Sequence, residues 1–126
     1  MTAAARQRAY ARGRRGEQIA AWWLRLTGHR VLARGFRCPV GEVDLIVRRG
    51  GILAVVEVKR RHSLAAAGEA VRLRQQRRIR RAAEHFLQRR PDLAHLQLRF
   101  DAVLLAPRRL PRHLKDAWNA DMLLPY

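Results

Sequence analysis

Apolar and polar residues alternate along two neighbouring stretches, residues 41–47 and 52–59, with the period of two that is typical of β-strands. Between them lies Arg49-Gly50-Gly51, and Gly-Gly is a common two-residue hairpin turn. The pattern therefore predicts an antiparallel hairpin. One face of this hairpin is entirely apolar and is expected in the core: Val43, Leu45, Val47, Ala54, Val56 and Val58.

The other face of the hairpin gathers charge at one end. With the two glycines at the tip, the register places Asp44 opposite Glu57 and Glu42 opposite Lys59. Opposed like charges destabilise a sheet by about 0.2–1 kcal/mol when exposed and by more when buried. A cation held between Asp44 and Glu57 relieves that repulsion, and two oxygen ligands completed by water are typical of Mg²⁺. The pattern leaves open a solvated sheet face with an ordinary Glu42–Lys59 ion pair.

Apolar residues at helical spacing predict helices before and after the hairpin. The first runs from about Gly16 to Leu26 and ends at Thr27-Gly28, because Gly is typical just beyond a helix C-terminus. We expect its apolar stripe in the core rather than as a base-stacking platform. That stripe is Ile19, Trp22, Trp23 and Leu26. The second helix is expected over residues 68–89 and stops near Pro91.

Two further strands, at residues 30–37 and 96–105, complete the predicted elements. The order is helix, three strands, helix, strand, which indicates an α/β fold with a mixed sheet flanked by helices. A chain of 126 residues builds one core and not two, so residues 16–106 are predicted as one domain. Residues 1–15 form a basic N-terminal arm that precedes or extends the first helix, with an organellar transit peptide as the alternative. Residues 107–126 form a C-terminal tail.

The charge balance indicates a polyanionic partner. There are 27 Lys and Arg against 10 Asp and Glu, a formal net charge of +17, which favours nucleic acid or an anionic membrane surface. No stretch approaches the roughly 18 apolar residues of a membrane span. The single Cys38 excludes an internal disulfide and is typical of a reducing compartment, so we expect a cytoplasmic protein. The five histidines lack metal-ligand spacing, which argues against zinc.

Arginine is concentrated in the predicted second helix. Six arginines occur there within ten residues: Arg72, Arg74, Arg77, Arg78, Arg80 and Arg81. This density exceeds that of an ordinary solvated face and favours contact with phosphate groups. Gln75 falls instead on the inward-facing stripe, between Val71 and Ile79, where a polar side chain needs a partner.

Several motifs together resemble a known protein family. The motifs are Gly16-Glu17, Gly41-Glu42-Val43-Asp44-Leu45-Ile46, Val56-Glu57-Val58-Lys59-x-Arg61 and Arg99-Phe100-Asp101. Each is common by itself, but the four in this order and spacing are specific. Over residues 13–106 the chain resembles the YraN-like family of small bacterial proteins, within the PD-(D/E)XK nuclease superfamily. The resemblance implies a restriction-endonuclease-like fold with an α-β-β-β-α-β core.

The resemblance also implies a catalytic set of four residues. Asp44 and Glu57 match the ligands of a divalent cation, Mg²⁺ or Mn²⁺. Glu17 matches an acid in the first helix that completes the metal shell. Lys59 matches the lysine that orients or stabilises the attacking water. Together they imply metal-assisted hydrolysis of a phosphodiester.

Two more residues match motif positions with supporting roles, and a third departs from the motif. Glu42 and Arg61 match the pattern, whereas Gln75 stands where the family has a lysine. One positive charge near the implied site is therefore missing. This departure bears on efficiency and on the choice of substrate.

These observations predict a Mg²⁺-dependent endonuclease that acts on DNA, either branched like a Holliday junction or single-stranded. The alternative is a nucleic-acid-binding module that keeps the nuclease-like fold without turnover, and a weaker one is a protein that binds ribosomal RNA. No membrane association is expected. A homodimer is compatible with the fold-level analogy to junction resolvases.

Overall fold

The computed structural model describes residues 2–62 and 73–118, with only the backbone described for residues 8–12. The helices are α1 (Ala3–Leu26) and α3 (Leu73–Arg89), and a 3₁₀ turn spans Pro91–Leu93. The strands are β1 (Arg30–Cys38), β2 (Gly41–Arg49), β3 (Ile52–Arg60), β4 (Gln97–Leu105) and β5 (Arg112–Leu114). The four predicted strands are confirmed to within two residues at each end. The expected start of the second helix lies outside the described residues.

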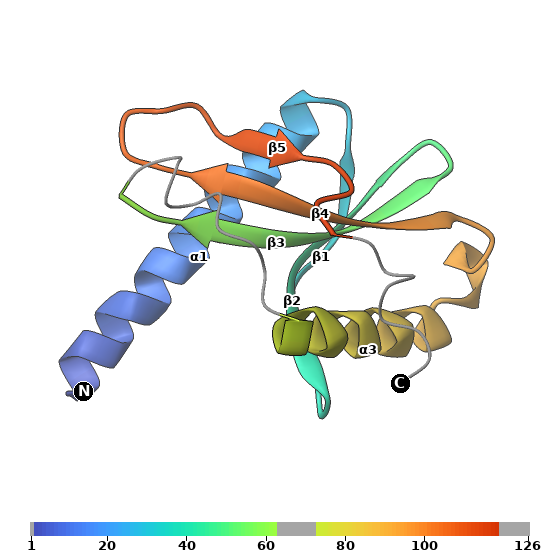
Figure 1. Ribbon diagram of the computed structural model, residues 1–126, viewed down its shortest axis with the longest axis horizontal. Coiled ribbons are helices and arrows are strands. Elements are labelled where there is room, and N and C mark those ends of the chain that lie inside the picture. Colours follow the sequence, from blue (N-terminus) through green and yellow to red (C-terminus); the bar gives the residue numbers. More distant parts are fainter. Residues whose placement is uncertain (1, 63–72, 119–126) are drawn as a thin grey trace.

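The strands form one five-stranded sheet in the order β1-β2-β3-β4-β5 (Figure 1). Neighbouring strands are antiparallel except β3 and β4, which are parallel. A parallel pair needs a crossover connection, and the segment that contains α3 supplies it. The sheet is thus mixed and flanked by helices, as the sequence predicts. This is the arrangement of a restriction-endonuclease-like α/β core.

The hairpin has the predicted register. Strands β2 and β3 pair from Arg49 opposite Ile52 at the turn to Leu45 opposite Val56. Beyond that last pair, the backbone N–H of Val58 donates a 2.8 Å hydrogen bond to Oδ2 of Asp44. A side-chain carboxylate thus accepts from β3 where the ladder between the two strands ends.

Each helix covers one group of buried sheet residues. In α1, Ala20, Ala21 and Leu24 are fully buried. They pack with Leu45, Val47, Ala54, Val56, Val103 and Leu105. In α3, the buried residues are Ile79, Ala82, Ala83 and Phe86. They pack with Val43, Ile46, Leu53, Val55, Phe100 and Trp118. Both faces of the central strands are therefore core.

One residue of the predicted apolar face lies in the other cluster. Val43 is fully buried as expected, but it packs in the cluster of α3 and not with Leu45 and Val47. The pairing explains this, because Val43 is paired with Phe36 of β1 beyond the end of the β2–β3 ladder. Phe36 itself packs against the α3 cluster, where its ring meets that of Phe86 edge to face.

The first helix corrects two predictions. It begins at Ala3 rather than near Gly16, with the Thr2 hydroxyl accepting a 3.1 Å hydrogen bond from Ala5 N as the N-cap. The predicted arm thus extends the helix. The predicted apolar stripe is wrong for three of its four residues, because Ile19, Trp22 and Leu26 are 42%, 55% and 61% exposed, while Trp23 is half-buried. Small residues face the sheet instead and let the helix backbone approach it closely. These are Gly16, Ala20 and Ala21.

The segment predicted as a tail contributes a strand. β5 pairs antiparallel with β4, and Trp118 stacks on Phe100 with ring centroids 4.2 Å apart. The fully buried Asp101 links the two strands, because it accepts two 2.8 Å hydrogen bonds from Arg99 and one of 2.7 Å from His113. Among the described helices, we find none with the length and apolar character to span a membrane.

Candidate functional site

Asp44 lies at the centre of the predicted site. Its carboxylate is largely shielded between β2 and β3, where Val58 N donates to Oδ2. Burial raises the pKa of Asp44, and the charge of Glu42 adds to this effect, while the Val58 N–H opposes it. The acid is thus held in a place that disfavours its own negative charge. A cation at this point stabilises the ionised form.

Glu57 faces Asp44 from the neighbouring strand, as the register predicts. Burial, the charge of Asp44 and a side-chain hydrogen bond with Asp44 raise the pKa of Glu57 to about 8, against an opposing effect of Lys59. Without a cation, one proton is therefore shared by the two carboxyl groups at neutral pH. Gln75 of α3 donates from Nε2 to Oε1 of Glu57 at 3.0 Å. The amide thus has a hydrogen-bond partner, but Gln75 is exposed and does not belong to the buried stripe that the sequence predicts for it.

Glu17 and Glu42 bring two more carboxylates to Asp44. One oxygen from each of the three residues lies within 4.8 Å of the others. Burial raises the pKa of Glu17, and the charges of Asp44 and Glu42 raise it further. Glu42 also forms a 3.5 Å ion pair with Arg37 of the neighbouring strand β1. Asp44 thus belongs both to the pair with Glu57 and to this group of three.

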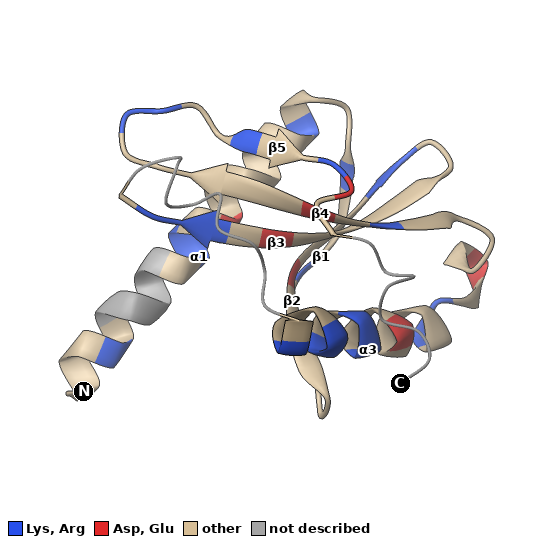
Figure 2. Cartoon of the chain, in the orientation of Figure 1, with Lys and Arg blue, Asp and Glu red and all other residues tan. Residues whose placement is uncertain are grey.

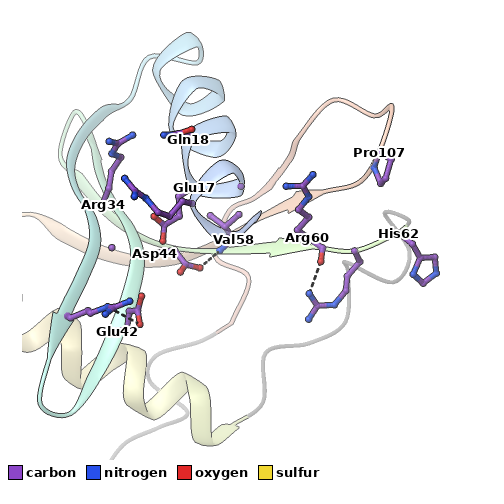
Figure 3. A pocket seen from close by; sticks show the side chains of 15 residues that line it. Glu17, Gln18, Arg34, Glu42, Asp44, Val58, Arg60, His62 and Pro107 are labelled. Carbon is purple, nitrogen blue, oxygen red and sulfur yellow. Dashed lines mark hydrogen bonds and ion pairs between the residues drawn. The ribbon is translucent and has the colours of Figure 1, made fainter. Parts of the chain in front are cut away.

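A cavity of about 870 Å³ opens beside this group. Figure 3 shows Glu17 of α1 pointing toward Asp44, with Glu42 nearby on the end of β2. The cavity is lined by residues from α1, β1, β2 and the end of β3, including Glu17, Glu42, Asp44 and Arg61. Glu57, Lys59 and Gln75 are not among its lining residues. Alternation along β3 explains this, because Val58 and Arg60 face the cavity.

The remaining predicted residues lie around the site. Lys59 is half-buried on β3, and its charge lowers the pKa of Glu57. Arg61 is exposed at the cavity, where its Nη1 donates to the carbonyl of Arg60 at 2.8 Å. Both residues flank Asp44 and Glu57 with positive charge.

The arginines of α3 form a basic surface. Four are exposed, namely Arg74, Arg77, Arg78 and Arg81. Arg80 is half-buried and forms a 3.3 Å ion pair with Glu84. Arg72 lies outside the described residues. Figure 2 shows this basic run along α3, on the element that also carries Gln75 to the site.

Two glycines allow close approaches that the sequence did not reveal. A Cβ at Gly41 of β2 would lie 2.6 Å from the backbone carbonyl oxygen of Arg78, so only Gly allows α3 to contact the start of β2. Gly35 has a φ of +61°, and a Cβ there would contact both carboxylate oxygens of Glu17 at 3.7 and 3.9 Å. The first contact anchors the helix that carries Gln75. The second contact places Gly35 beside the carboxylate of Glu17 on α1.

Sequence reasoning missed six polar residues that line the cavity. These are Arg14, Gln18, Arg34, Arg37, Arg60 and His62. Arg14 precedes Glu17 on α1 by three residues, about one turn, so helical spacing could have found it. Gln18 lies one turn after Arg14 and directly follows Glu17. Arg34 and Arg60 needed the three-dimensional structure, because they come from β1 and from the end of β3, two strands that β2 separates in the sheet.

The fold defines the chain as a mixed α/β protein with a restriction-endonuclease-like core. Residues 16–105 match the model of "Uncharacterised protein family UPF0102". The chain belongs to this family, which confirms the YraN-like resemblance.

Curated relatives share this family name. The chain is 59% identical to the "UPF0102 protein" of Parvibaculum lavamentivorans over 111 residues, which are 88% of this chain and 84% of that protein. It is 53% identical to the one of Chelativorans sp., covering 91% and 93% of the two chains. It is 51% identical to "UPF0102 protein amb4503" of Paramagnetospirillum magneticum, covering 93% and 94%. The shared name assigns no activity.

Proposed function

We propose that this protein is a Mg²⁺- or Mn²⁺-dependent endonuclease that hydrolyses phosphodiester bonds in DNA. The observation that carries the proposal is the pair Asp44 and Glu57, two shielded carboxyl groups that face each other with raised pKa values. Two such groups repel each other when both are ionised. A site that holds both carboxyl groups side by side therefore suits a divalent cation, since such a cation prefers carboxylate oxygens and neutralises their repulsion.

The donor set supports a hard cation rather than zinc. Asp44 is common to two sets of oxygen donors: Glu57 lies beside it on β3, and Glu17 on α1 and Glu42 on β2 each place an oxygen within 4.8 Å of it. All are carboxylates, and water completes such a shell in Mg²⁺ sites. Bound there, the cation supplies Lewis-acid stabilisation of phosphoryl charge and lowers the pKa of a water molecule.

The protein's own groups supply the rest of the chemistry. Lys59, two residues after Glu57 on the same strand, provides a positive charge that stabilises the negative charge developing on the phosphoryl oxygens. The cavity beside Asp44 is lined by the arginines Arg14, Arg34, Arg37, Arg60 and Arg61. These side chains hold phosphate groups by charge-assisted hydrogen bonds. The scissile phosphate is thereby oriented before the reaction starts.

The net charge of +17 supports nucleic acid as the substrate. The basic surface of α3 adds phosphate contacts outside the cavity, at Arg74, Arg77, Arg78 and Arg81. Contacts of this kind make affinity fall steeply with salt, because each neutralised phosphate releases counterions. Binding by this surface does not depend on base sequence.

One observation favours a second candidate, a nucleic-acid-binding module without turnover. Gln75 donates to Glu57 from the position where the family has a lysine, so a neutral group replaces a cation beside the site. The intact set of Asp44, Glu57 and Lys59 favours the enzyme. The two candidates differ in one measurable property, which is cleavage.

The test is a panel of 5′-labelled single-stranded, linear duplex, flapped and four-way DNA incubated with 5 mM (roughly saturating) Mg²⁺ or Mn²⁺. We expect cleavage of at least one substrate that stops with EDTA. The Lys59→Ala variant should lose about 10²-fold or more of the rate, as removal of one charge-stabilising group does elsewhere. Lys115→Ala, which changes the other lysine of the chain, is the matched control and should cleave normally. Tight DNA binding without cleavage of any substrate supports the binding module instead.

A further inference from the structure

The outer face of α1 carries an apolar patch that the candidate site does not explain. Ile19, Trp22 and Leu26 are 42%, 55% and 61% exposed. They are three of the five exposed large hydrophobic residues in the described part of the chain. Burying a large aromatic side chain is favourable, so a tryptophan that is more than half exposed is a common mark of a binding surface.

This patch continues a row of residues that begins in the cavity. On a helix, residues four apart form one ridge. Arg14, Gln18 and Trp22 form such a ridge on α1, and the first two line the cavity beside Asp44. Trp22 follows Gln18 by one turn, about 6 Å along the helix axis. Figure 3 shows Gln18 on α1, beyond Glu17 as seen from Asp44. A nucleic acid strand that leaves the cavity along α1 would therefore contact Trp22 next.

The charge around Trp22 determines what the patch can bind. Arg15 and Arg25, seven residues before and three after Trp22, are both exposed on the same outer side of the helix. A two-fold pairing of this face with a second copy would bring these arginines together in a protein of net charge +17. A nucleic acid strand offers the opposite: phosphates for the arginines and the flat face of a base for the indole.

We propose that Trp22 is a stacking platform for an unpaired nucleotide next to the phosphate held in the cavity. Bases inside a duplex are already stacked on their neighbours and do not present a face to a surface side chain. The platform therefore selects single-stranded DNA, or a duplex with an unpaired segment, as the substrate class. This inference rests on the proposed function for the phosphate in the cavity. It adds the structural feature of DNA that the site recognises.

The test measures fluorescence anisotropy of a labelled 15-mer of thymidine and of a 15-base-pair duplex, at 50 and 200 mM (roughly physiological) salt with EDTA present. Trp22→Ala should weaken binding of the single strand by about 5- to 150-fold, the range that one stacked base contributes. Binding of the duplex should change by less than about twofold. Trp22→Phe, which keeps a ring, should retain most of the affinity. Leu110→Ala removes another exposed apolar side chain, 71% exposed, and is the matched control.

Three results would overturn the inference. Unchanged single-strand affinity in Trp22→Ala removes the platform, and so does an equal loss for the duplex. Sedimentation that shows a dimer of the wild type and a monomer of Trp22→Ala assigns the patch to self-association. Circular dichroism establishes that the variants are folded. EDTA prevents turnover, so the binding assay and the cleavage assay test different claims. Weaker single-strand binding by Trp22→Ala, together with no cleavage in the metal-containing assay, upholds this inference and refutes the nuclease. Cleavage by the wild type, with unchanged single-strand binding by Trp22→Ala, upholds the nuclease and refutes this inference.

Discussion

Gln75 of α3 donates a 3.0 Å hydrogen bond from Nε2 to Oε1 of Glu57 on β3. The bond joins the arginine-rich helix to the acid that faces Asp44. It also gives the amide of this exposed residue a partner on the sheet. A neutral donor here orients Glu57 without adding the positive charge that a lysine at this position would bring.

This contact predicts opposite effects for two substitutions of Gln75. Gln75→Ala leaves Glu57 without its donor and should lower the cleavage rate by about tenfold, the value of a hydrogen bond to a charged group. Gln75→Lys keeps a donor and adds a charge near the phosphoryl oxygens, so its rate should equal or exceed that of the wild type. The measurement is the single-turnover rate on the best substrate of the panel.

The matched control for these substitutions is Gln88→Ala, on the same helix with an exposed side chain. It should cleave at the wild-type rate. If Gln75→Ala and Gln88→Ala have the same rate, the hydrogen bond to Glu57 has no part in the reaction.

The raised pKa of Glu57 predicts how stability varies with pH in the absence of metal. The folded protein holds this proton up to a pKa of about 8, whereas the ordinary pKa of a glutamate side chain is 4.5. Stability from this group is therefore complete below about pH 4.5 and is lost as the pH rises through 8. Glu57→Gln cannot ionise and should gain about 2 kcal/mol over the wild type by pH 8.5, with no gain near pH 4.5, after allowance for partial solvation.

Urea unfolding at pH 4.5, 7 and 8.5 with EDTA measures this difference. Glu84→Gln, which neutralises an exposed acid of α3, is the control and should follow the wild type. Parallel pH profiles for the wild type and Glu57→Gln would mean that the two carboxyl groups do not repel each other in the folded protein.

Asp101 predicts the opposite dependence on pH. Burial raises its pKa, but the hydrogen bonds from His113, Arg99 and the Asp116 N–H outweigh burial and lower the pKa to about 2. The ionised acid therefore stabilises the fold at pH values above 3.8, the ordinary pKa of an aspartate, and about 2 kcal/mol is lost as the pH falls through 2. Asp101→Asn should destabilise the protein by about 3 kcal/mol at pH 7, because Arg99 is left without its charged partner.

Thermal unfolding between pH 2 and 7 checks this prediction. The gap between the wild type and Asp101→Asn should narrow as the pH falls. Asp92→Asn changes an exposed ion pair with Arg90 and should have little effect at any pH. A gap that stays constant down to pH 2 would show that the charge of Asp101 is not what holds β5 to β4.

The sequence predicted the strands and the hairpin well because local chemistry determines both. Gly50 and Gly51 set the turn, and the alternation of apolar residues set the register that brings Asp44 to Glu57. The motif spacing then identified the acids of the candidate site. These features depend on residues that are close in sequence or in adjacent strands.

What the sequence could not predict depends on packing between distant elements. Helical periodicity indicated Ile19 and Trp22 as core, but the sheet packs against Ala20, Ala21 and Leu24. The pattern on α1 has apolar residues on both sides, so hydrophobicity alone does not say which side is buried. The cavity arginines and β5 were missed for a similar reason, because they come together only when the twisted sheet has formed.

The central claim is that Asp44 and Glu57 hold a divalent cation. Isothermal titration of the metal-free protein with Mn²⁺, at pH 7 in two buffers of different ionisation enthalpy, tests it most directly. We predict binding with release of about one proton, because Glu57 with a pKa of about 8 must lose its proton to bind the ion. Proton release should vanish near pH 9 (roughly one unit above that pKa), and Asp44→Ala should not bind. The same binding heat in the wild type and Asp44→Ala would contradict the claim.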